Sequence, residues 1–295
     1  MALFGKRNTE QDERAKADAD RLARGGLPLD AERRLADLRG RGGAFFTSGL
    51  SVNELALTAS EGVRPLGQVM GSTVYHVGWQ YTPIYQSMEL TTLSHAQYHA
   101  RLLALSRLQQ EARLLGAHGV VGVRLERRAY DWGTNLLEFA ARGTAVALPG
   151  GPAPEHPFVC ALSGQEYFAL RRGGYAPVGF AFGTCTFYHV ASYMTQWVNQ
   201  GGIFGGGMMN QELTDYTQAV YTARHAATGR MQEEARRVGA EGVVGVTVED
   251  TIRTHEVEIN SQTRRDLVVE FTALGTCIAA AGPDTLAIHY ALPLG

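Results

Sequence analysis

Apolar residues recur at helical spacing in two long segments of the chain, residues 87–115 and 210–238. The matched positions are Leu90/Leu213, Leu93/Tyr216, Ala100/Ala223, Ala104/Ala227, Leu108/Met231, Ala112/Ala235 and Leu115/Val238. Because three- and four-residue steps fall on one side of an α-helix, each segment predicts a long helix with one apolar face. Ser87 and Asn210 are predicted as the N-cap residues of these helices, since their side chains accept hydrogen bonds from free helix N–H groups.

Each predicted helix runs into nearly the same sequence, EARLLGAHGVVGV at 111–123 and EEARRVGAEGVVGV at 233–246. Gly116 and Gly239 are predicted to end the helices, where a left-handed residue is favourable. Further on, GTAV in copy 1 matches GTCI in copy 2. Internal repetition of this length predicts a duplicated structural unit.

The same order of elements is expected in each copy: a short hairpin (46–57 or 158–169), a strand, the long helix and two further strands. The motif YHV occurs at 75–77 and at 188–190 with a one-residue shift, which is expected to come from a β-bulge. The prediction is therefore an α+β fold of two tandem β-α-β-β units. Each unit has a long helix on a small antiparallel sheet, and a charged helical N-terminal segment precedes them.

Period-two alternation assigns the two faces of each sheet. The helix-facing positions are predicted to be Val121, Val123, Leu125, Leu137, Phe139 and Ala141 in copy 1, and Val244, Val246, Val248, Val269, Phe271 and Ala273 in copy 2. The opposite face is predicted to carry Val120, Gly122, Arg124 and Glu138 in copy 1, and Val243, Gly245, Thr247, Glu270 and Leu274 in copy 2. A face of this mixed character is expected to be a subunit interface, and its bare glycines allow another backbone to approach.

The domain boundaries follow from the repeat. We expect a charged helical segment at 1–43, repeat 1 at 44–149, a linker at 150–157, repeat 2 at 158–282 and a C-terminal tail strand at 283–295. In the first segment Asp30 is predicted to cap a short helix that stops at Gly40, and the segment is expected to be a solvated helical prefix or a partner-binding arm. Copy 2 carries extra residues near 199–209 and 250–262.

Composition limits the classes of function. The net charge is −2, so nothing in the overall balance attracts nucleic acid or an anionic membrane. The chain begins without the apolar run of a signal peptide and has no stretch of about eighteen apolar residues, so no membrane span is expected. The expected location is therefore the cytoplasm.

The metal-ligating residue types occur in incomplete sets. His95 and His99 lie four residues apart on the predicted helix and so share a face, but copy 2 has Gln218 and Thr222 at these positions. Two surface histidines are therefore favoured over a metal site, and no metal is predicted.

The three cysteines, Cys160, Cys185 and Cys277, lie far apart and form no CxxC motif, which argues against a disulfide framework or a zinc ribbon. Cys185 and His189 are separated by about 13 Å along a strand, too far to share a metal directly. Cys277 is expected to approach Cys185 if their strands pair, although buried thiols packing as small apolar groups are favoured. No hydrolytic triad, zinc-protease or phosphate-binding motif is present, so no catalytic residue and no cofactor is predicted.

A glycine-rich segment, GGIFGGGMMN at 201–210, precedes the second long helix. Its apolar residues Ile203, Phe204, Met208 and Met209 are predicted to bind a partner, since Met and Gly surfaces repack easily. The alternative is a flexible loop that folds against its own helix. Aromatic residues before the helices are expected to pack beneath them or, in a ring, to stack on a flat cofactor: Trp79, Tyr81, Tyr85 and Trp197.

The helix-end motifs EARLLGAHGVVGV and EEARRVGAEGVVGV, followed by GTAV and GTCI, resemble the YbjQ-like family, whose name refers to heavy-metal binding. The resemblance covers most of 44–149 and 156–280. It implies dodecin-like β-α-β-β units, and single-domain members of the family assemble as rings of five. No metal-ligand motif is transferred by it.

Together these observations predict a non-enzymatic, ring-forming scaffold or binding protein. The alternative is an oligomer that stores a metal or a small molecule. The expected partner is the chain itself, in a cyclic homo-oligomer of five chains, and a second protein bound through the 201–209 loop. Two arrangements are open: two stacked rings with one copy of each chain in each layer, which is preferred, or both copies alternating in one ring.

Overall fold

The computed structural model describes residues 9–40, 46–76, 84–129, 136–199, 210–260 and 262–281. They form a mixed α+β fold with one four-stranded sheet in each copy, which confirms the predicted class. Sheet A, in copy 1, has the order β1 (Arg64–His76), β4 (Leu136–Ala147), β3 (Gly119–Ala129) and β5 (Phe158–Val159). Sheet B, in copy 2, has the order β2 (Met88–Glu89), β6 (Tyr175–His189), β8 (Gln262–Ala280) and β7 (Gly242–Ile259).

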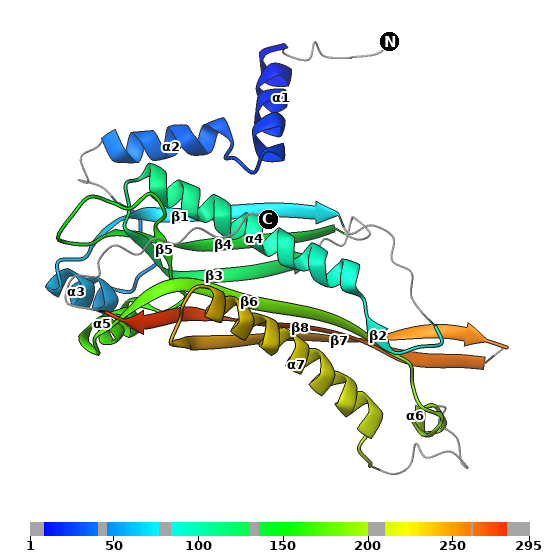
Figure 1. Ribbon diagram of the computed structural model, residues 1–295. Helices are drawn as coiled ribbons and strands as arrows, with labels where there is room; N and C mark the ends of the chain where they lie inside the picture. The colour runs from blue at the N-terminus through cyan, green and yellow to red at the C-terminus, as the bar shows by residue number, and fades with distance from the viewer. Residues whose placement is uncertain are drawn as a thin grey trace.

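Short segments therefore cross between the copies, because β2 belongs to copy 1 by sequence but pairs with β6, and β5 from the start of copy 2 pairs with β3. The hairpin of β7 and β8 is longer than that of β3 and β4 and projects beyond the rest of sheet B (Figure 1). This extension accounts for the extra residues near 250–262.

The two long helices are α4 (Thr91–Leu114) and α7 (Thr214–Arg237). Both begin four residues after the predicted caps, and neither has a side-chain cap. In copy 1 the reason is that Met88 and Glu89 pair with β6 as a strand, while Ser87 bonds to His189 and to the Val190 amide. The polar residues at 87 and 89 thus serve the contact with sheet B instead of the helix N-terminus.

Each helix lies in very close contact with the first strand of its unit. A Cβ atom on Gly71 would lie 2.0 Å from the Ala104 carbonyl oxygen, and one on Gly183 would lie 2.1 Å from that of Ala227. Glycine at both positions lets helix backbone rest directly on strand backbone. The duplicated GS/GT pair in the first strands therefore has a packing function in each copy.

The expected hairpins at the start of each copy are wrong, because both segments are helical. These helices are α3 (Val52–Ser60) and α5 (Gly164–Arg172). Each has a full capping box, Ser51 with Glu54 and Ser163 with Glu166. The reciprocal bonds satisfy free N–H groups at the helix start, a signal present in the sequence as the matched Ser and Glu positions.

Gly122 and Gly245 adopt positive φ angles of 65° and 60°, and the register of β3 and of β7 shifts at these points. This bulge reverses the alternation, so that Val120 packs with the helix side, whereas Val121 packs with Leu162 and Tyr167. The predicted faces are thus wrong for Val121 and Val120 and, for the same reason, for Val244 and Val243 in copy 2. The bulge expected near the YHV motifs is also wrong, since the register is continuous from Gly67 to His76 and from Gly179 to His189.

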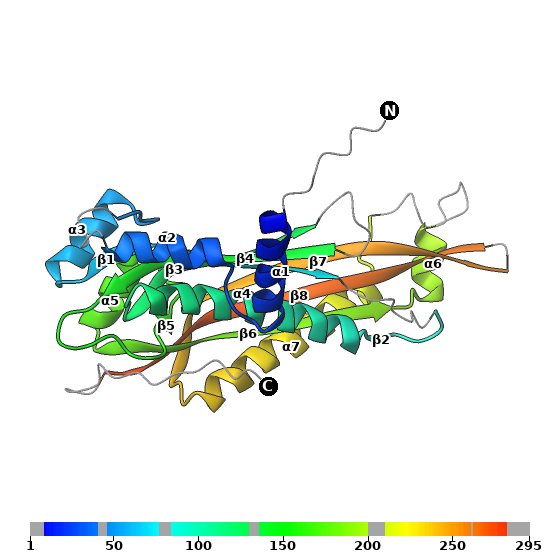
Figure 2. The same ribbon diagram turned by 90° about the horizontal axis from the view of Figure 1, so that it is seen from above.

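The N-terminal segment forms α1 (Thr9–Ala23) and α2 (Leu29–Gly40), and α2 lies beside α4 (Figures 1 and 2). Leu35 is 1% exposed within the core around α4, and Arg34 makes a bidentate ion pair with Glu111. A purely solvated prefix is therefore wrong for α2. No helix among the described residues is long and apolar enough to cross a membrane.

Candidate functional site

The most extensive feature of the molecule is the contact between its two units. One side of α4 covers sheet A, and another side packs on the face of sheet B that points away from α7. The strands β6 and β8 of sheet B are therefore covered on both faces, whereas most of β7 is exposed. The near-continuous apolar run of β6 reflects this double burial, because Phe180 and Phe182 face α4 while Ala181 and Cys185 face α7.

An aromatic pair anchors this contact. Tyr98 of α4 stacks on Phe182 of β6, with ring centroids 4.8 Å apart and an interplanar angle of 27°. The Tyr98 hydroxyl donates to Glu234 of α7, whose second oxygen accepts from the Phe182 amide at 2.9 Å. Burial raises the pKa of Glu234, and the hydrogen bonds from Tyr98 and the Phe182 amide oppose this effect.

A buried polar network lies further along the same contact. The Gln97 amide of α4 donates to Glu270 of β8 at 3.1 Å, and Arg127 of β3 and Arg253 of β7 both pair with Glu270. The Thr184 hydroxyl donates to the Gln97 carbonyl oxygen at 3.3 Å. Glu270 is 5% exposed. A buried carboxylate needs such partners, so the network fixes how the two units meet.

Arg101, one helical turn after Gln97, is also buried at this contact and lies 4.6 Å from the centroid of the Phe139 ring. Burial lowers the pKa of Arg101 to about 10, and the charge of Glu249 opposes that effect. The guanidinium remains protonated at neutral pH, and its planar face suits the aromatic ring.

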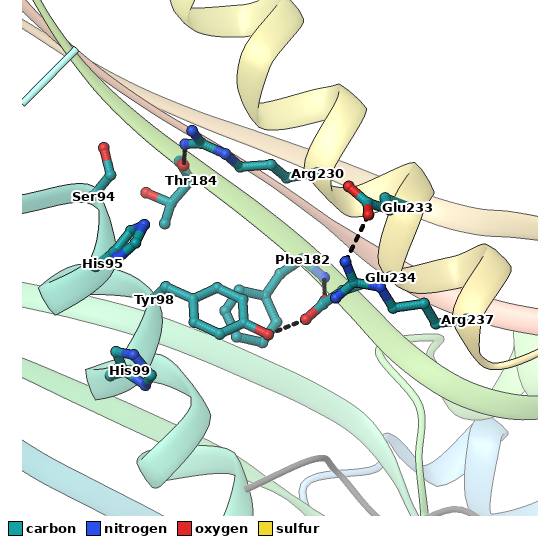
Figure 3. A pocket seen from close by; sticks show the side chains of 10 residues that line it. All are labelled: Ser94, His95, Tyr98, His99, Phe182, Thr184, Arg230, Glu233, Glu234 and Arg237. Carbon is teal, nitrogen blue, oxygen red and sulfur yellow. Dashed lines mark hydrogen bonds and ion pairs between the residues drawn. The ribbon is translucent and has the colours of Figure 1, made fainter. Parts of the chain in front are cut away.

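A groove of about 460 Å³ runs between α4, β6 and α7 (Figure 3). His95 and His99 line its α4 side, while Arg230 and Glu233 line the α7 side. Arg230 already makes a bidentate ion pair with Glu89, at 2.6 and 2.7 Å. The two histidines share a helix face, as predicted.

Among the residues that the structure describes, no three His, Cys, Asp or Glu side chains come together as a metal site. All three cysteines are buried, and burial raises the pKa of each thiol to about 12. Cys277 does not approach Cys185, although their strands pair. Cys277 lies opposite Gly179, which is six residues, or about 20 Å, along β6 from Cys185.

The structure brings together one Ser–His–Asp group that the sequence motifs do not indicate. Ser87 Oγ lies 3.2 Å from His189 Nδ1, and His189 Nε2 lies 3.4 Å from Asp215 Oδ2. Asp215 also accepts from Thr195 and from the Ser192 amide. Burial disfavours its charged form, but these hydrogen bonds outweigh burial and lower the pKa of Asp215 to about 2.

This group ties β6 and α6 (Tyr193–Asn199) to the start of α7. The predicted partner-binding residues Ile203, Phe204, Met208 and Met209 follow α6 but lie outside the described residues, as do Trp79, Tyr81 and the tail 283–295. Tyr85 and Trp197 are described and are 76% and 40% exposed, so they do not pack beneath a helix as expected.

Comparison with known proteins bears on this architecture. The family model described as "Putative heavy-metal-binding", YbjQ, matches residues 61–149 and 201–280, that is, both copies. The chain belongs to the YbjQ family. The tandem arrangement of YbjQ-like units is thereby confirmed.

An encapsulin nanocompartment protein of Mycobacterium tuberculosis is similar to this YbjQ-family chain, with 40% identity over 255 residues. The match covers 84% of this chain and 92% of the relative. No solved structure matches the chain.

Sequence reasoning on this YbjQ-family chain missed the contact between the units, although a signal for it was present. The strand LGQVMGSTVYHV has the polar residues Gln68 and His76 where its counterpart VGFAFGTCTFYHV has Phe180 and Tyr188. A strand without alternation is covered on both faces. Glu270 and Leu274 are predicted to lie at an interface between subunits. Both are instead buried at the contact between the two units of one chain.

Proposed function

We propose that this protein is a non-enzymatic scaffold that assembles head to tail with copies of itself and takes part in a protein nanocompartment. The observation that carries the proposal is the packing of α4 on the free face of sheet B. It leaves two unlike surfaces at the ends of the chain, the outer side of α7 and the outer face of sheet A. The relative from M. tuberculosis, named an encapsulin nanocompartment protein, supports the nanocompartment role.

Several exposed apolar side chains occupy these end surfaces. Tyr221, Val246 and Val248 are 61%, 47% and 47% exposed on copy 2, and Met70 and Val74 are 53% and 58% exposed on copy 1. Exposed apolar side chains that gather in this way are typical of protein–protein interfaces. Since the two surfaces differ, a contact between them is heterologous and propagates into a ring or a filament.

The resemblance to ring-forming proteins favours a closed ring; the count of five chains is expected for two stacked layers with five units in each. The units of one chain already stack helix on sheet, which favours both copies alternating within one ring over two stacked layers. The 201–209 loop is retained in the proposal as a contact for a second protein.

Native mass spectrometry and negative-stain electron microscopy of the purified full chain test the assembly. We expect one closed species well above the mass of the 32.0 kDa chain at micromolar concentration. A strictly monomeric chain under these conditions would overturn the proposal. Co-expression with an encapsulin shell protein, followed by gradient sedimentation, tests the nanocompartment role, and failure to co-sediment would remove that part.

A fluorophosphonate probe tests the non-enzymatic part, since it labels activated serines. The Ser87 hydroxyl accepts from the Val190 amide at 2.9 Å, and Asp215 is held by several donors besides His189. We therefore expect no labelling of Ser87. Labelling that disappears in His189→Ala would identify an enzyme instead.

A further inference from the structure

One edge of the first unit is completed by the chain that leads into the second. The segment 158–162 runs along the outer edge of β3, where the Cys160 amide donates to the Val120 carbonyl at 2.9 Å and the Gly122 amide donates to the Leu162 carbonyl at 2.8 Å. The matching strand of copy 2, β7, is the terminal strand of sheet B. Within the described part of the chain no strand pairs with its outer edge.

The counterpart of the completing segment is residues 46–50. The Ala161 amide donates to Thr276 Oγ1 at 2.9 Å, and the Gly49 amide donates in the same way to Thr144 Oγ1 at 3.0 Å. Both segments therefore sit alike on their own sheets. By this equivalence Phe46 corresponds to Phe158.

The ring of Phe158 packs directly over Gly119, in a space, here called the socket, that a side chain at that position would fill. Phe158 is 5% exposed, and a Cβ atom on Gly119 would lie 2.3 Å from its ring. Gly242 is the counterpart of Gly119 in β7, and a Cβ atom there would meet only Ile278, at 3.8 Å. Gly242 thus presents an open socket, while Phe46 is 38% exposed on the other end of the chain.

Apolar side chains near the outer edges of β3 and β7 also differ in exposure, being covered in copy 1 and open in copy 2. Val123 and Leu125 of β3 are 3% and 8% exposed because sheet B covers them, whereas their counterparts Val246 and Val248 are both 47% exposed. On the opposing surface, Phe182 is 1% exposed and its counterpart Met70 is 53% exposed. At these three positions an apolar side chain that is buried between the units has an exposed apolar counterpart at the end of the chain.

We propose that residues 46–50 of a second copy of this chain add as a strand to the outer edge of β7, with Phe46 seated on Gly242. The outer face of the second copy's sheet A then covers α7 and β7, as sheet B covers α4 and β3. This inference rests on the proposed self-assembly and names the surfaces that perform it. Strand addition of this kind supplies main-chain hydrogen bonds, and the seated side chain supplies specificity.

The contact between chains differs from the internal one at several places, since Val220, Gln68 and Arg142 are the counterparts of Gln97, Phe180 and Leu274. At the internal contact, Arg127 pairs with the buried carboxylate of Glu270. At the contact between chains, the counterpart of Arg127 is Asp250 and the counterpart of Glu270 is Glu138, so two acidic residues meet there. Val52 occupies the position at which Gly164 meets Glu54. The contact between chains is therefore weaker than the internal contact, which suits reversible assembly.

The first test is Gly242→Leu in the full chain, with Gly151→Leu as the matched control, since a Cβ atom on Gly151 meets nothing within 4 Å. Sedimentation velocity and circular dichroism are measured on both. We expect Gly242→Leu to fold normally and to raise the dissociation constant of the assembly at least tenfold, and Gly151→Leu to assemble like the wild type. Phe46→Asp, at an exposed side chain on the opposite surface, should have the same effect as Gly242→Leu.

The second test is a gain of assembly. Asp250→Arg recreates the arginine of the internal pair opposite Glu138 of the neighbouring chain, so we expect a dissociation constant at least fivefold lower than that of the wild type. Glu138→Gln should abolish this gain.

The two tests separate this inference from the proposed function. If the wild type assembles and Gly242→Leu and Phe46→Asp assemble equally well, this interface is wrong and self-assembly stands. If the wild type remains monomeric at micromolar concentration, both fail. Absence of any gain in Asp250→Arg would refute the pairing with Glu138.

Discussion

Gly71 offers a direct test of how the long helix rests on its sheet. An alanine at this position would place its Cβ 2.0 Å from the Ala104 carbonyl oxygen and 2.5 Å from the Leu108 amide nitrogen. Both are backbone atoms, so no side-chain rotation relieves the overlap. The helix α4 or the strand β1 has to move.

The size of the movement follows from these distances. An ordinary contact of 3.4 Å requires separation by about 1.4 Å along that direction. A gap of 0.5 to 1 Å already removes roughly a quarter to a half of the dispersion energy of a contact. Overpacking of this kind costs about 1–3 kcal/mol and sometimes more. Since α4 contacts both sheets, we expect Gly71→Ala to lower the free energy of unfolding by about 3 kcal/mol.

Urea unfolding followed by circular dichroism measures this cost, at several protein concentrations because assembly would add to apparent stability. Gly229→Ala is the control. It lies within α7 with nothing within 4 Å of its Cβ position, so alanine should stabilise by about 0.5–1 kcal/mol through the lower flexibility of the unfolded chain. If Gly71→Ala unfolds within 0.5 kcal/mol of the wild type, the helix does not rest on β1 as described.

Three further predictions concern the unit contact, acid stability and metals. Phe182→Ala should lower the free energy of unfolding in urea by about 3–5 kcal/mol. Met70→Ala, at the counterpart position, should lower it by less than about 0.5 kcal/mol, and similar costs for the two variants would contradict the burial of Phe182. The pKa of Asp215 is lowered to about 2, so its contribution is present at neutral pH and is lost as pH falls from about 4 towards 2. Asp215→Asn should flatten the pH dependence of unfolding in that window, and an unchanged slope would exclude this role. Zinc, copper or nickel should change stability by less than about 1 kcal/mol, and stoichiometric binding in calorimetry that is lost in His95→Ala would show otherwise.

The repeated units, the long helices and the class of fold could be predicted from the sequence because periodicity and duplication are local signals. Helix starts were misplaced for a physical reason. Ser87 is a good N-cap residue in isolation. In the structure, however, Ser87 bonds to His189 and Met88 pairs with β6 as a strand, so the helix begins further along the chain. Tertiary pairing overrides local preference here.

The faces of β3 could not be assigned by alternation alone, because the left-handed Gly122 inserts a bulge. The contact between the units depends on pairs far apart in the chain, such as Gln97 with Glu270. Neither residue stands out in its local sequence, and a single sequence does not show which residues far apart in the chain lie close together in space. The asymmetry between the two first strands was the one readable trace of that contact.

The linker at 150–157 has a kinetic consequence. In a set of separate units every contact forms at the prevailing protein concentration, whereas two units on one short tether meet at an effective concentration on the order of millimolar. The contact of α4 with sheet B is therefore complete in every chain, however dilute. In the proposed assembly, only the contacts between chains would then depend on protein concentration, and assembly would start from pairs of units instead of from single units.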